Sequence, residues 1–152
     1  MDLILWRHAD AEEGFPDLAR QLTRKGHDQA AKMAGWLKTQ IPDPSELTLL
    51  VSPATRARQT AEAFSHEFEI VHEVGLGASV NQILVAANWP YAKGTVIVVG
   101  HQPTLGEVAQ ILQPDIPPGL SFRKGSVWWF QYRKKNAAAE TVLHTVKYPE
   151  SL

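Results

Sequence analysis

Residues 3–8 have the sequence Leu3-Ile4-Leu5-Trp6-Arg7-His8, a continuous apolar run that ends abruptly in two basic side chains. An unbroken apolar run of this length is typical of a strand that is covered on both faces of a sheet. Two similar runs lie at Leu47–Val51 and at 96–99. Because they are short and contain β-branched residues, we predict strands rather than helices at all three places.

Stretches with the period of an α-helix separate these runs. Thr23 is placed to cap a helix whose apolar face includes Met33 and Leu37. Ser79 and Gln82 fit a capping box in front of a second helix, and Pro103 opens a third. Alternating strands and helices predict a mostly parallel sheet that is covered by helices on both sides.

A fourth helix is predicted after the strand at Leu47–Val51. Ser52 has the form of an N-cap, and Pro53 would occupy the first helical position. The apolar stripe expected for this helix consists of Ala57, Ala61, Phe64 and Phe68.

The last third of the chain has a different pattern. A loop is predicted where Pro114, Pro117, Pro118 and Gly119 cluster. Residues 127–130 and 141–148 form two expected strands, and the polar residues 133–136 are expected to form the turn between them. We therefore predict an α/β fold, a three-layer αβα sandwich with a mostly parallel central sheet and a C-terminal antiparallel hairpin.

Composition excludes several classes of protein. A length of 152 residues suits one domain, which we expect to span 1–152. The net charge of -1 argues against a nucleic-acid-binding protein, and the absence of cysteine excludes a disulfide scaffold and thiolate metal sites. No run approaches 18 apolar residues, and the first residues lack the features of a secretory signal. We expect a soluble cytoplasmic protein.

Four basic residues follow the predicted strands. Arg7 and His8 come after the first, Arg56 lies soon after the second, and His101 comes directly after the third. Because ligands of open parallel sheets bind at the carboxyl ends of the strands, these side chains are expected to meet at one site. Arginine binds phosphate oxygens in a bidentate manner, and a neutral histidine can attack phosphorus. The pattern therefore predicts phosphoryl chemistry.

Each of these residues alone would more commonly be structural. We assign a structural or surface role to the remaining histidines, namely His27, His66, His72 and His144. Trp128 and Trp129 are expected in the core or on the sheet surface rather than in a platform for stacking bases.

Four ordered motifs resemble those of the histidine phosphatase superfamily. Residues 5–11 (LWRHADA) resemble its RHG-type signature in the RHA variant, and 22–26 (LTRKG) resemble its LTxxG helix opening. Residues 51–61 (VSPATRARQTA) are similar to its SPxxRAxQTA segment, and 98–103 (VVGHQP) to its GHxP segment. The short chain and the RHADAE start are most similar to SixA-type phosphohistidine phosphatases.

The resemblance implies a role for each residue. His8 matches the phosphorylated nucleophile, and Arg7, Arg56 and His101 match the rest of the phosphate pocket. Arg58 is the less suitable of the two nearby arginines, because Arg56 aligns with the SPxxR position. The resemblance also implies that no metal or other cofactor is used.

The sequence departs from the family at two points. Ala9 replaces the commonest glycine, and the acidic motif that supplies a general acid in mutase-like members has no clear match. Asp10, Glu12, Glu13 and Glu73 are the candidates for that acid. Without an acid, an alkoxide would leave poorly, whereas an imidazole is readily protonated near neutral pH.

The expected function is therefore removal of phosphate from phosphohistidine on a partner protein. Small-molecule phosphomonoesterase or mutase-like activity and non-catalytic phosphate binding are the alternatives. A metal hydrolase with His8, His101 and Asp10 as ligands is disfavoured, because two arginines beside the site would repel a cation. The segment from Ala9 to Leu22 and the stretch 65–94 both look too short to enclose a metabolite, so an open pocket is expected.

Overall fold

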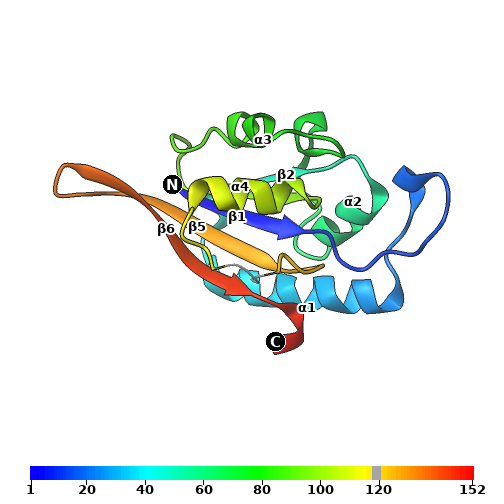
Figure 1. The fold of residues 1–152 in the computed structure, drawn as a ribbon. Coiled ribbons are helices and arrows are strands. Elements are labelled where there is room, and N and C mark those ends of the chain that lie inside the picture. Colours follow the sequence, from blue (N-terminus) through cyan, green and yellow to red (C-terminus); the bar gives the residue numbers. More distant parts are fainter. Residues whose placement is uncertain (118–120) are drawn as a thin grey trace.

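The computed structural model describes residues 1–117 and 121–152 and is built around a six-stranded sheet (Figure 1). The strands lie in the order β3-β2-β4-β1-β5-β6. Their bounds are β1 Asp2–Arg7, β2 Leu47–Val51, β3 Glu69–Ile70, β4 Thr95–Gly100, β5 Val127–Lys135 and β6 Ala138–Lys147. β1 pairs in parallel with β4 and antiparallel with β5, so the first strand of the chain lies inside the sheet.

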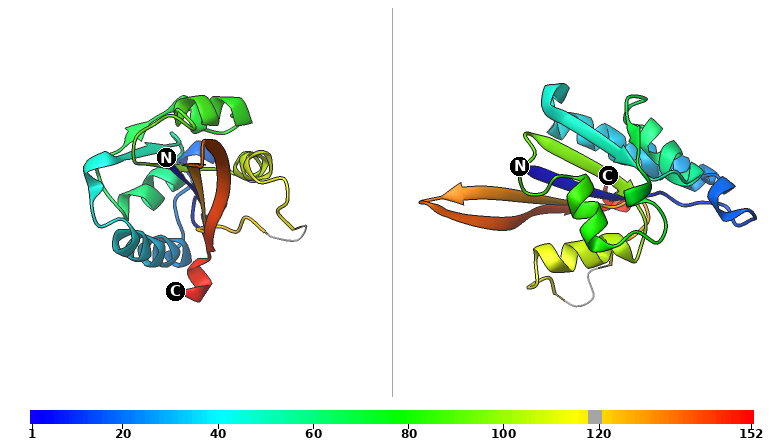
Figure 2. Two further views of the ribbon diagram at one scale, coloured as in Figure 1. Left: turned by 90° about the vertical axis from the view of Figure 1, so that its left-hand side faces the viewer. Right: turned by 90° about the horizontal axis from the view of Figure 1, so that it is seen from above.

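Helices cover both faces of this sheet (Figure 2). They are α1 Arg24–Gln40, α2 Thr55–Glu62, α3 Val80–Ala86 and α4 Thr104–Leu112. Successive residues of β1 point to opposite faces, so Leu3 and Leu5 pack with α3 and α4 whereas Ile4 and Trp6 pack with α1 and α2. Burying each such side chain stabilises the fold by about 1.5–3 kcal/mol. The predicted three-layer αβα sandwich is confirmed.

Two of the predicted helix caps are confirmed. The hydroxyl of Thr23 accepts a hydrogen bond from the Gly26 amide at the start of α1. Ser79 and Gln82 form the reciprocal capping box of α3. Pro103 stands at the N-cap of α4, as its place in the sequence suggests.

The predicted start of α2 is wrong, whereas its predicted apolar stripe is confirmed in part, because Ala57 and Ala61 are buried on the helix. The helix begins at Thr55, because the Ser52 hydroxyl is bonded to the Ala54 amide in a turn that precedes the helix. It ends at Glu62, so Phe64 and Phe68 lie beyond its last turn, half-buried against the core on the α1 side.

The hairpin is longer than the sequence suggested. β5 continues to Lys135, and the turn is formed by Asn136 and Ala137, with φ angles of 52° and 67°. Figure 1 shows the hairpin extending well past the rest of the sheet, where solvent surrounds it. Residues 133–135 of the predicted turn are therefore a solvated strand end, and Asn136 alone of the predicted 133–136 lies in the turn. Pro114 and Pro117 lie in the predicted loop, whereas Pro118 and Gly119 are outside the described residues.

Within residues 1–117 and 121–152, none of the helices combines the length and apolar character needed to span a membrane.

Candidate active site

The carboxyl ends of three neighbouring strands bring the predicted site together. Arg7 pairs with Gly100 at the end of the β1–β4 ladder, and the His8 amide donates to the Gly100 carbonyl at 3.1 Å. The Ser52 amide donates to the Val99 carbonyl at 3.1 Å, which fixes the end of β2 beside β4. As a result the rings of His8 and His101 lie 5.2 Å apart between their centroids.

His8 is buried and has a defined tautomer. Its Nδ1 lies 2.8 Å from the Ala9 carbonyl, which can only accept, so Nδ1 carries the proton and the lone pair is on Nε2. Burial is the main reason that the pKa of His8 is lowered to about 4, and the charges of Arg56 and Arg7 contribute to this lowering. His8 is therefore neutral near pH 7, which is the form that a nucleophile needs.

His101 is held through its Nε2, whereas His8 is held through its Nδ1. Its Nε2 lies 2.7 Å from Oγ of Ser52, and its Nδ1 is buried with no partner among the described residues. Burial is the main reason that the pKa of His101 is lowered to about 3, and the neighbouring His8 and Arg56 contribute to this lowering. The ring thus has one fixed nitrogen and one free nitrogen.

The two arginines reach the site from different elements. Nη1 of Arg7 donates to the Phe122 carbonyl at 2.9 Å, and burial lowers the pKa of this guanidinium. Arg56, on the first turn of α2, is buried, whereas Arg58 is exposed. The structure therefore places Arg56, not Arg58, in the site.

Three of the four predicted site residues carry a buried nitrogen that lacks a partner. These are Nε of Arg7, Nε of Arg56 and Nδ1 of His101, and within the described residues the only other such side-chain atoms belong to two tryptophans. Buried polar groups are normally hydrogen-bonded. Such donors suit an anion with several acceptor oxygens, and a phosphoryl group has that chemistry.

The sequence analysis missed Asp17, which contacts Arg56 twice. Its carbonyl accepts from Nη1 of Arg56 at 2.9 Å, and its Oδ2 lies 3.1 Å from Nη2. Asp17 belongs to a 3₁₀ turn, Asp17–Ala19, in the segment from Ala9 to Leu22 that we expected to be too short to enclose a metabolite. No local motif announces Asp17, because the contact depends on how the segment folds back.

The acidic candidates lie elsewhere. Asp10 accepts from Thr23 at 2.7 Å and from Lys124 at 3.2 Å, and the Thr23 hydrogen bond is the main reason that its pKa is lowered. Glu12 and Glu13 are exposed, and Glu73 faces a different cavity beside β3. None of these four side chains forms a hydrogen bond or ion pair with Arg7 or Arg56.

A cavity of about 360 Å³ opens beside the site. Asp17 and Ser52 contribute its polar wall near the arginine and the histidine. The other lining residues are Pro16, Leu18, Pro53, His72, Gly75 and Leu76. His72, assigned to a structural role from the sequence, thus lies at the cavity and is exposed.

The other histidines and the tryptophans lie away from the site. His27, His66 and His144 are exposed. Trp128 stacks on Phe122 and Trp129 packs on the α1 side of the sheet, as expected for core residues. In the described part of the chain, no group of three or more His, Asp or Glu side chains is placed to hold a metal ion.

Known proteins are similar to this chain in sequence and in fold. The family model of the histidine phosphatase superfamily (branch 1) matches residues 3–77. An uncharacterised protein of Mycobacterium tuberculosis is 32% identical over 114 residues, covering 70% of this chain and 68% of the relative.

Solved structures agree over nearly the whole chain. The protein histidine phosphatase SixA in complex with tungstate is 25% identical, with a TM-score of 0.81 and 99% of both chains covered. A candidate SixA phosphohistidine phosphatase from Nakamurella multipartitia is 27% identical, with a TM-score of 0.78, covering 97% of this chain and 95% of that one. A phosphoserine phosphatase from Entamoeba histolytica shares the fold at 16% identity, with a TM-score of 0.68 and coverage of 99% and 98%. The chain belongs to the histidine phosphatase superfamily, and within it the chain is SixA-like.

Proposed function

We propose that this phosphatase removes the phosphoryl group from phosphohistidine on a protein, with His8 as the transient carrier of that group. One observation supports the proposal above all. A neutral His8 with its lone pair on Nε2 lies against the ring of His101, beside two arginines. Within the described part of the chain, neither Nδ1 of His101 nor Nε of either arginine has a hydrogen-bond partner. Nucleophile and anion-binding groups are thus assembled in one buried place.

The reaction would proceed in two steps. Nε2 of His8 attacks phosphorus, the phosphorus–nitrogen bond of the substrate breaks, and its electron pair goes to the leaving imidazole. Water then attacks the phosphorylated His8, and the electron pair of the second phosphorus–nitrogen bond returns to Nε2. Arg7, Arg56 and His101 would donate to the phosphoryl oxygens in both steps. Neither step uses a metal ion.

Two lines of argument support phosphohistidine as the substrate. None of the acidic side chains Asp10, Glu12, Glu13 and Glu73 contacts the site arginines, and a phosphorus–nitrogen bond needs less proton donation than an ester. The similar SixA structure is described as a protein histidine phosphatase. By the same reasoning we propose a phosphorylated protein as the partner and a cytoplasmic single-domain enzyme, which the lack of cysteine suits.

Hydrolysis of a small phosphate ester is the second candidate. The cavity beside Ser52 favours it, because about 360 Å³ is enough to receive part of a metabolite. The E. histolytica relative is named a phosphoserine phosphatase, so this fold also accommodates a small substrate. A non-catalytic phosphate-binding protein would bind phosphate at the same groups without releasing it from a substrate.

The deciding experiment compares kcat/KM for a phosphohistidine-bearing domain with kcat/KM for sugar and glycerate phosphates. We expect the phosphohistidine domain to be preferred. Preference for a metabolite by tenfold or more, about 1.4 kcal/mol of transition-state free energy, would overturn the proposal. A single-turnover assay of phosphate release separates an enzyme from a binding protein.

The role of His8 is tested separately. His8→Ala should abolish turnover and leave the fold intact, and a rapidly quenched wild-type reaction should give an acid-labile phosphate on His8. The matched control is His27→Ala, which removes an exposed imidazole from α1. Substantial turnover by His8→Ala would rule out a mechanism in which His8 carries the phosphoryl group.

A further inference from the structure

The carboxylate of Asp17 lies where an anion is unexpected. Its Oδ2 is 3.1 Å from Nη2 of Arg56, and its Oδ1 is 3.0 Å from Nη1 of Arg20. The Arg56 side chain is 4% exposed, whereas that of Asp17 is 51% exposed. The carboxylate therefore reaches from solvent onto a buried arginine.

Such a carboxylate opposes the binding of phosphate esters. A phosphoryl group held by Arg56 would lie within a few ångströms of Asp17, and like charges at that distance repel. Repulsion would be stronger for a metabolite that carries a second anionic group beside its phosphate. A purely structural tie between Arg56 and the segment would need no carboxylate, because the Asp17 carbonyl already accepts from Nη1.

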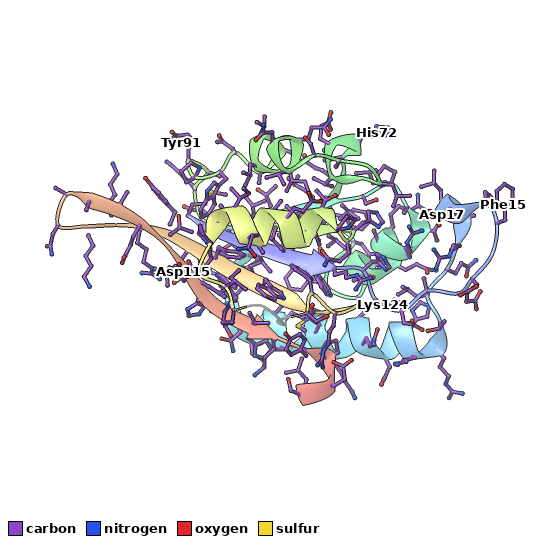
Figure 3. All side chains as sticks on the ribbon, viewed as in Figure 1. Phe15, Asp17, His72, Tyr91, Asp115 and Lys124 are labelled. Carbon is purple, nitrogen blue, oxygen red and sulfur yellow. The ribbon has the colours of Figure 1, made fainter. Side chains whose placement is uncertain are left out.

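Asp17 also lines the cavity next to the site, together with the apolar residues Pro16 and Leu18 from its own segment. Pro53 and Leu76 also line this cavity. Figure 3 shows Asp17 on the segment that extends past the end of β1. A flat ring in this cavity would therefore contact apolar side chains and have a negative charge beside it.

A protonated imidazole matches this environment. Phosphohistidine that carries phosphorus on one ring nitrogen and a proton on the other has a cationic, planar leaving group. We propose that the carboxylate of Asp17 accepts a hydrogen bond from the protonated ring nitrogen of the substrate's phosphohistidine and so determines the specificity of the site. This inference rests on the proposed function and names a residue that selects for it.

The chemistry balances without a general acid. When Nε2 of His8 attacks phosphorus, the phosphorus–nitrogen bond breaks and its electron pair stays on the substrate nitrogen. The ring proton bound to Asp17 remains on the other nitrogen, so the leaving group departs as neutral imidazole. The Asp17 carboxylate thus favours phosphohistidine that is protonated on its other ring nitrogen. In this form the nitrogen that leaves phosphorus needs no proton.

The geometry leaves room for this contact. Each carboxylate oxygen offers about two acceptor sites, and the hydrogen bonds from Arg20 and Arg56 use one site of each oxygen. The Arg20 hydrogen bond, followed by that of Arg56, lowers the pKa of Asp17, which keeps the carboxylate ionised near neutral pH. Asp17 is therefore an acceptor rather than a proton donor.

The test is a change of specificity in Asp17→Asn, which keeps the shape of the side chain and removes its charge. The substrates are a phosphohistidine peptide, p-nitrophenyl phosphate, whose leaving group departs as an anion without a proton, and 3-phosphoglycerate. We expect kcat/KM for the peptide to fall at least tenfold relative to p-nitrophenyl phosphate, and kcat/KM for 3-phosphoglycerate to rise. Asp17→Glu should recover part of the preference because it restores the charge.

The matched control is Asp28→Asn, which removes an exposed carboxylate that is also paired with a basic residue, Lys32. This variant should leave the ratio of kcat/KM for the peptide to kcat/KM for p-nitrophenyl phosphate unchanged. If Asp17→Asn lowers kcat/KM for all three substrates equally, the residue is structural and the inference fails. The inference also fails if the ratio is unchanged while the wild type still hydrolyses the peptide, although the proposed function then stands. A wild type that hydrolyses only the esters overturns both.

Discussion

The hydroxyl of Ser52 lies 2.7 Å from Nε2 of His101, and both side chains are buried. The same hydroxyl accepts from the Ala54 amide at 3.2 Å. A serine hydroxyl can donate to an unprotonated ring nitrogen or accept from a protonated one. Ser52 can therefore hold His101 in either protonation state and leave Nδ1 for the phosphoryl group.

Removal of this hydroxyl should weaken catalysis by mispositioning His101. For Ser52→Ala we expect kcat/KM to fall roughly 10- to 100-fold, which is less than the roughly 100- to 1,000-fold for loss of a direct donor because Ser52 acts through His101. We also expect a loss of stability of about 1 kcal/mol from the broken hydrogen bond. Steady-state kinetics and urea unfolding measure the two effects. Wild-type kcat/KM, with an unaltered pH profile, would show that Ser52 does not position His101.

Of the two arginines on α2, Arg56 should contribute more than Arg58 to the affinity for phosphate or vanadate. Arg56→Ala is expected to weaken vanadate or phosphate binding by about 2–4 kcal/mol, because it removes a buried charge-assisted donor. Arg58→Ala is the control, since Arg58 is exposed on the same helix. Isothermal titration with vanadate compares them. A larger loss in Arg58→Ala would mean that our assignment of the helix is wrong.

Stability should depend on pH through the two buried histidines. The unfolded chain protonates them near pH 6.5, whereas in the folded protein burial lowers the pKa of His8 to about 4 and that of His101 to about 3. Between these values the unfolded state binds more protons, so stability is complete above about pH 6.5 and falls as the pH drops toward 4. The free energy of unfolding should fall by about 3 kcal/mol from the shift of the His8 pKa.

Urea unfolding of the phosphate-free protein at several pH values measures this dependence. His8→Asn should show a smaller loss of stability over the same range. An unfolding free energy that stays constant from pH 7 to pH 4 would contradict the assignment of neutral, buried imidazoles.

Catalysis should not depend on a metal ion. Prolonged treatment with a chelator is expected to leave the rate unchanged, because the proposed steps use arginine and histidine donors at every phosphoryl oxygen. Phosphate release before and after treatment is the measurement. Activity that disappears and returns only with an added divalent cation would refute this expectation.

Sequence patterns were sufficient for the parts of the fold that depend on local chemistry. The apolar runs gave the buried strands, and the hydroxyl of Thr23 marked the start of α1 because capping involves neighbouring residues. The predicted start of α2 was wrong because the Ser52 hydroxyl accepts from the Ala54 amide in a turn before the helix and also contacts His101 across the sheet. Asp17 was missed for the same reason, since its partner Arg56 is 39 residues away.

One motif gains a physical reason only from the structure. In the LTRKG segment, a Cβ at Gly26 would collide with the carbonyl of Asp10, two residues after His8. Helix α1 therefore packs directly against the backbone that leads away from the nucleophile. The sequence alone supplies the glycine but not this neighbour.

The long β5–β6 hairpin has a practical consequence. β5 runs antiparallel to β1, so the turn at Asn136 and Ala137 lies beyond the amino end of β1, whereas His8 follows its carboxyl end. A dye or surface linker attached through Asn136→Cys would be the only thiol in the chain and would stand at the far end of the molecule from the reacting atoms. The hairpin thus offers an anchoring point for immobilised or single-molecule measurements, and equal turnover by the free and the tethered protein would verify its suitability.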